Sequence, residues 1–60
     1  MPNELEQKKL NLFEQGFRFQ SYYERNSSAI EEAREWRDRG YHTRILYDGT
    51  VYLVWIKKKK

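Results

Sequence analysis

The sequence of 60 residues contains no cysteine and a single histidine, His42. Without cysteine the chain forms neither disulfides nor thiolate metal sites, and one histidine cannot build a zinc site of the usual kind. Small domains usually need such a cross-link or a partner subunit for stability. We therefore expect this chain to depend on self-association or on the packing of its aromatic residues, which are three Phe, five Tyr and two Trp.

Long apolar runs and catalytic motifs are also lacking. No run approaches the ~18 residues typical of a membrane span, and no signal-peptide hydrophobic region follows Met1. No G-x-S-x-G, no H-E-x-x-H and no glycine-rich phosphate loop is present. We expect a cytoplasmic protein without membrane insertion, enzymatic activity, cofactor or bound metal.

Charge is concentrated at the end of the chain. Twelve Lys and Arg stand against nine Asp and Glu, which gives a formal charge of +3. Four of the twelve are Lys57–Lys60; without them eight basic residues face nine acidic ones, a net charge of −1. A protein that binds duplex nucleic acid normally has a basic face. We divide the chain into a domain over residues 1–56 and a basic tail over residues 57–60.

Residues 3–15 are predicted to form a helix, because Asn3 and Glu6 have the spacing of a capping box and Gly16 suits the left-handed residue that ends a helix. A strand is predicted over residues 17–23. Its alternation assigns two sets of side chains to opposite faces, namely Phe17, Phe19, Ser21 and Tyr23 against Arg18, Gln20 and Tyr22.

A second helix is predicted over residues 28–39, where Ser28 and Glu31 form a capping box and Gly40 follows the last turn. Strands are predicted over residues 41–47 and 50–57. Asp-Gly between them predicts a two-residue type I′ turn. The resulting register places Tyr47 opposite Thr50, Ile45 opposite Tyr52, Thr43 opposite Val54 and Tyr41 opposite Ile56.

Neither face of this hairpin is polar. One face carries Tyr41, Thr43, Ile45, Tyr47, Tyr52, Val54 and Ile56, and the other carries His42, Arg44, Leu46, Val51, Leu53 and Trp55. The last strand is therefore expected at the centre of the sheet, covered on both sides. A right-handed crossover through the second helix then gives the strand order 1-3-2. The expected fold is α+β, α-β-α-β-β, with a three-stranded mixed sheet packed by helices.

The second helix can cover only one face of this sheet. Two alternatives remain for the other face. The first helix covers it within the same chain, or a homodimer buries it, with or without exchange of the N-terminal helices.

The segment "AIEEAREWRDRGYHTRILYDGTVYLVWI" contains an amphipathic helix, an Arg-Gly-Tyr turn and an alternating hairpin. It resembles SPOR-like and other small split β-α-β modules over about half of the chain. The resemblance implies that architecture. SPOR domains have a further helix-strand unit that this chain lacks, so their binding of denuded glycan is not implied. In composition the chain is similar to small uncharacterised proteins of archaea and their mobile elements.

The function predicted from these features is a non-enzymatic interaction module, in which an apolar sheet face mediates self-association or binding of a protein partner. The alternative is a nucleic-acid-binding protein, in which aromatic and arginine side chains of the sheet stack on bases and contact phosphates. The lysines would then add salt-dependent affinity; otherwise they keep the apolar strand end soluble. The candidate residues are Arg18, Tyr22, His42, Arg44, Leu53, Trp55, Lys57, Lys58, Lys59 and Lys60.

Overall fold

The computed structural model describes residues 4–59. Its elements are α1 (Glu4–Glu14), β1 (Arg18–Tyr23), α2 (Asn26–Asp38), β2 (Tyr41–Tyr47) and β3 (Tyr52–Lys58). The strands form one sheet in the order β1-β3-β2, which confirms the predicted order. Both pairings are antiparallel, so the prediction of a mixed sheet is wrong. β1 and β2 do run in the same direction, but β3 lies between them and they never pair.

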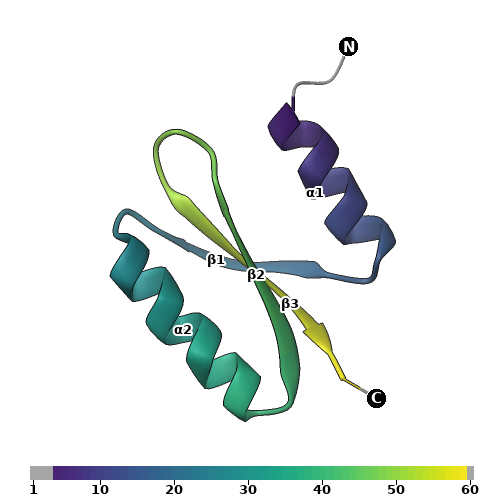
Figure 1. The fold of residues 1–60 in the computed structure, drawn as a ribbon, viewed down its shortest axis with the longest axis vertical. Coiled ribbons are helices and arrows are strands. Elements are labelled where there is room, and N and C mark those ends of the chain that lie inside the picture. Colours follow the sequence, from purple (N-terminus) through teal and green to yellow (C-terminus); the bar gives the residue numbers. More distant parts are fainter. Residues whose placement is uncertain (1–3, 60) are drawn as a thin grey trace.

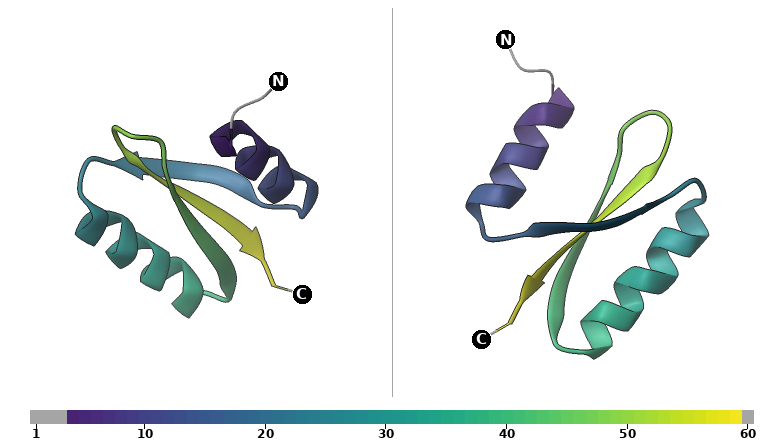
Figure 2. Two further views of the ribbon diagram at one scale, coloured as in Figure 1. Left: turned by 45° about the horizontal axis from the view of Figure 1, so that its top comes forward. Right: turned by 180° about the vertical axis from the view of Figure 1, so that it is seen from behind.

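The two helices lie on opposite sides of the sheet (Figure 1). In the tilted view of Figure 2, α2 lies below the strands and α1 above them. α2 packs through the buried residues Ala29 and Ala33, whose small side chains allow a close approach to the sheet. α1 buries only Leu12. The second sheet face is therefore covered by the first helix of the same chain, but only in part.

Glycine ends both helices, as predicted. Gly16 has a φ of 97° and its N–H donates to the Phe13 carbonyl, while the Phe17 N–H donates to the Leu12 carbonyl at 2.9 Å. These two bonds, with Leu12 and Phe17 in one apolar cluster, make a Schellman motif. Gly40, with a φ of 93°, follows α2. Asn3, the predicted cap of the first helix, lies outside the described residues.

The predicted capping box of the second helix is wrong. α2 begins at Asn26, two residues earlier than expected, and Ser28 lies inside its first turn. Arg25 occupies the N-cap with an extended backbone and no side-chain cap bond. The helix extends because the Arg25 carbonyl already accepts a hydrogen bond from the Ala29 N–H at 3.3 Å.

The hairpin loop is longer than predicted. Tyr47 lies opposite Tyr52, so four residues connect the strands and the predicted register is wrong by two residues. The Asp48 carboxylate accepts hydrogen bonds from the N–H groups of Thr50 and Val51, both at 2.8 Å. Only Gly49 in this loop has a positive φ, which rules out a type I′ turn. An even shift leaves every side chain on its predicted face.

A β-bulge in β1 changes the predicted faces of the first strand. Phe19 lies opposite Trp55 and Ser21 opposite Val54, so Gln20 is the extra residue. Beyond the bulge Tyr22 joins Phe19 on the α1 side of the sheet, whereas Ser21 and Tyr23 face α2. The strict alternation predicted for residues 17–23 is therefore wrong.

The core divides into two small groups. On the α1 side, the buried residues are Leu12, Phe17, Leu53 and Trp55, with Leu46 and Val51 packed against them. On the α2 side, they are Ala29, Ala33, Thr43 and Val54. Val54 is the largest fully buried side chain of residues 4–59. The core is thin even for a chain of this size.

Candidate functional site

Four large apolar side chains are exposed around α1, and we call them the α1-side patch. Leu10 and Phe13 belong to α1, and Phe19 and Tyr22 to the sheet face that α1 covers. Their exposed fractions are 50%, 70%, 48% and 63% respectively. Single exposed apolar residues are ordinary, but a group of them around one helix indicates a binding surface.

The structure places two of the predicted interface residues beneath this patch. Leu53 and Trp55 are buried in the α1-side core. The Phe19 ring packs edge-on against Trp55, with ring centroids 5.8 Å apart. The Nε1–H group of Trp55 is buried and has no hydrogen-bond partner among residues 4–59. Leu53 and Trp55 therefore lie beneath the patch and support it. Of the residues predicted to form an interface, Tyr22 is the one that belongs to the exposed patch itself.

Five cations lie toward the end of the sheet where β1 begins and β3 ends, next to Phe19 of the α1-side patch. This cationic end consists of Arg18, Arg44, Lys57, Lys58 and Lys59. Arg18 lies opposite Ile56, and Arg44 lies opposite Trp55. β3 continues through Lys57 and Lys58, so these two lysines belong to the strand and not to a tail.

The neighbouring segments hold the cationic end in place. His42 is exposed and lies opposite Lys57 across the β2–β3 pair. The Lys59 N–H donates to the Gly40 carbonyl at 3.1 Å, which fixes the strand end beside the end of α2. Lys60, predicted with the other three lysines, lies outside the described residues.

The cations of this end are not neutralised by acidic neighbours. Lys8–Glu4 is the one ion pair found within residues 4–59, and it lies on α1. Arg44 and Lys57 instead lie over the Phe17 ring, 5.5 and 6.0 Å from its centroid. An anion that bound at this end would reduce the repulsion among its like charges.

A pocket of about 490 Å³ opens at the cationic end. Its lining combines three cations with aromatic, amide and apolar groups: Arg18, Lys57 and Lys58 with Gly16, Phe19, Gln20, Tyr41 and Ile56. The Lys57 side chain passes beside Gly16, since a Cβ at Gly16 would lie in ordinary van der Waals contact with Lys57 Cε at 3.4 Å.

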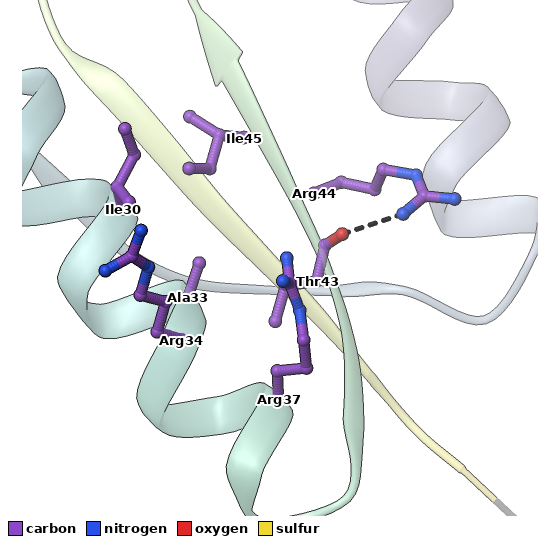
Figure 3. Close-up of a pocket in the computed structure, with 7 residues that line it drawn as sticks. All are labelled: Ile30, Ala33, Arg34, Arg37, Thr43, Arg44 and Ile45. Carbon is purple, nitrogen blue, oxygen red and sulfur yellow. Dashed lines mark hydrogen bonds between the residues drawn. The ribbon is translucent and has the colours of Figure 1, made fainter.

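A second pocket, of about 350 Å³, lies between α2 and the edge strand β2 (Figure 3). The side chains of Arg34 and Arg37 extend from α2 into this pocket. Arg44, although it lines the pocket, points away from those two residues and donates from Nη1 to the Thr43 carbonyl at 2.8 Å. The remaining lining is Ile30, Ala33, Thr43 and Ile45. Three cations line each of the two pockets, but here Arg44 directs its guanidinium away from Arg34 and Arg37.

The Glu32 carboxylate joins β1 to α2. It accepts hydrogen bonds from the Ser21 hydroxyl and from the Tyr23 hydroxyl, the latter at 2.6 Å. This bond to a carboxylate raises the pKa of Tyr23 above its usual value. The three groups connect α2 to β1, and the nearby negative charge of Glu35 also contributes to the raised pKa of Tyr23.

Over residues 4–59 the chain also lacks the features of two other classes of site. In that part of the chain no group of three or more His, Asp or Glu side chains is arranged to hold a metal ion. Neither described helix has the length and apolar character that crossing a membrane requires.

Comparison with protein-family models, with curated proteins and with solved structures gave no match to this chain. The resemblance to SPOR-like modules therefore stays a prediction. The evidence for function comes from the two surfaces described above, of which the sequence indicated Tyr22 and the cations but not Leu10, Phe13 or Phe19. The bulge at Gln20 moves Arg18 away from Tyr22, and no pattern in residues 17–23 reveals it.

Proposed function

We propose that this chain is a non-enzymatic interaction module that self-associates through the α1-side patch. The observation that carries the proposal is the 70% exposure of Phe13, beside three other exposed apolar side chains. Keeping such residues in water forgoes the burial energy of roughly 25 cal/mol per Å² of apolar surface.

The thin core favours a second copy of the chain as the molecule that covers the α1-side patch. A domain below about 70 residues rarely gains enough stability from one core. In residues 4–59 only Val54 and the smaller Ala29 show no exposed surface. An identical chain is available wherever the chain is made, and the stability that it contributes rises with the concentration of the chain itself.

The size of the patch predicts a moderate affinity. Aromatic side chains bury roughly 150–250 Å² each, so the partly exposed members of the patch offer on the order of 400 Å² per copy. A standard interface buries about 800 Å² per partner. Polar groups around the patch must supply the remainder, and we expect a dissociation constant of about 1–100 μM.

Light scattering across a concentration series tests this proposal. We expect a mass that rises from one chain toward two chains over the micromolar range. Phe13→Ser should raise the dissociation constant about tenfold or more, because both copies lose an aromatic contact. Tyr47→Ser is the matched control, since Tyr47 is 54% exposed but lies at the hairpin loop. A monomer at all concentrations, or an equal effect of both variants, contradicts the proposal.

A further inference from the structure

We propose that the cationic end binds single-stranded nucleic acid, with one nucleotide in the pocket between β1 and the end of β3. This surface is separate from the α1-side patch, apart from Phe19, which borders both. The proposal of nucleic-acid binding rests on charge, whereas the proposal of self-association rests on exposed apolar area. Each proposal can therefore be tested and rejected without the other.

Charge complementarity indicates a polyanion as the ligand. Arg18, Lys57 and Lys58 line the pocket, and none of them forms an ion pair within residues 4–59. Glu14 and Asp38 end the neighbouring helices but do not pair with these cations. Phosphates spaced along a chain could bind all three cations at once and release their counterions.

The other groups of the pocket fit a nucleotide better than an acidic peptide. Tyr41 offers an aromatic surface on which a base can stack, and its ring is held at 79° to the Trp36 ring with centroids 4.9 Å apart. Gln20, which the bulge displaces from regular pairing, offers an amide that can donate to and accept from a base edge. A carboxylate side chain could accept a hydrogen bond from the Gln20 amide but would not stack on the Tyr41 ring.

The shape of the site indicates a single strand. The pocket of about 490 Å³ can take a base with its sugar, but only a base that has left its pair can enter it. Many proteins that recognise duplex DNA insert a helix into its major groove. Here neither described helix projects beyond the cationic end, because both helices terminate near it. We therefore expect a duplex to bind only through its phosphates, and more weakly.

Fluorescence anisotropy with a labelled oligothymidine of about ten nucleotides provides the test, with the matching duplex and a polyglutamate peptide as competitors. Three phosphate contacts predict that the logarithm of the binding constant falls with the logarithm of salt concentration with a slope of about −2. Arg18→Ala and Lys58→Ala should each weaken binding about fivefold at 0.1 M salt and reduce that slope.

Matched control variants distinguish binding at the pocket from nonspecific attraction to the positive charge of the whole chain. Arg25→Ala and Lys8→Ala remove the same charges from exposed positions that do not line the pocket, and we expect changes below about twofold. Tyr41→Leu should weaken binding about tenfold without changing the salt slope, because stacking releases no counterions. Phe13→Ser should bind the oligonucleotide as the parent chain does.

Three results would overturn the proposal. The first is duplex or polyglutamate competing as well as the single strand does. The second is equal losses in the variants of Arg18 and Arg25, which would show a diffuse charge effect. The third is the absence of binding at low salt by a chain whose circular dichroism spectrum shows it folded.

Discussion

At the scale of single residues, two turns depend on particular backbone and side-chain groups. Gly16 has a positive φ that residues with a Cβ rarely adopt. Asp48 closes the hairpin through its carboxylate, which replaces the type I′ turn expected from Asp-Gly. Both residues were recognised in the sequence as turn residues, but only the first acts in the expected way.

We expect Gly16→Ala to destabilise the fold by about 1–2 kcal/mol, the cost of a left-handed conformation for a residue with a Cβ. Gln15→Ala, on the exposed residue before it, should change stability by less than about 0.5 kcal/mol. Urea unfolding followed by circular dichroism measures both. Equal stability of Gly16→Ala and the parent chain would show that the Schellman turn is not needed.

The Asp48 carboxylate makes hairpin stability depend on acid pH. Hydrogen bonds from the N–H groups of Val51 and Thr50 lower the pKa of Asp48 below its usual value of 3.8. A lowered pKa in the folded state stabilises the fold above about pH 4, and the effect is lost as the pH falls through the folded-state pKa. We expect Asp48→Ala to be less stable than the parent at pH 7 and equally stable once Asp48 is protonated. A difference between the two chains that does not change with pH would contradict this assignment.

At the scale of elements, β1 shows how one extra residue determines a surface. The bulge at Gln20 lets Phe17 and Phe19 face α1 while Ser21 and Tyr23 bond to Glu32 of α2. Without it, one half of the strand would turn its side chains to the wrong side of the sheet. The bulge thus allows one short strand to place apolar side chains toward α1 and polar side chains toward α2.

Deletion of Gln20 should therefore destabilise the fold by about 3 kcal/mol or more, because Phe17 would leave its buried position or Tyr23 would lose Glu32. Gln20→Ala is the control that keeps the residue count, and we expect it to change stability by less than about 0.5 kcal/mol. Urea unfolding measures both variants. A deletion variant as stable as Gln20→Ala would show that the two faces do not depend on the bulge.

The sequence predicted element order, strand order and the faces of the hairpin, because periodicity, glycine terminators and the crossover rule act locally or through topology. It predicted the details that arise from competing local bonds less well. The Asp48 side chain lengthened the hairpin loop, and the Arg25 carbonyl extended α2 past the expected cap at Ser28. Exposure of Leu10 and Phe13 followed from how α1 sits on the sheet, which no local pattern encodes.

At the scale of the whole molecule, the fold forms two distinct surfaces, the α1-side patch and the cationic end, from residues that are interspersed in the sequence. The net charge of the chain without its four terminal lysines is −1, yet β1, β2 and β3 bring Arg18, Arg44 and Lys57 to one end. Four of the six large apolar side chains that are exposed in residues 4–59 belong to α1 or to the sheet face that α1 covers. We propose that one of these surfaces binds a second copy of the chain and that the other binds a polyanion.

The central claim is that a second copy covers the α1-side patch. The most direct measurement is an isotope-filtered nuclear Overhauser spectrum of an equal mixture of labelled and unlabelled chain, recorded above the dissociation constant. We expect intermolecular cross-peaks that connect the rings of Phe13 and Tyr22 to the methyl groups of Leu10 in the other copy. Intermolecular cross-peaks confined to α2, or none in a sample that light scattering shows to be dimeric, would contradict the account.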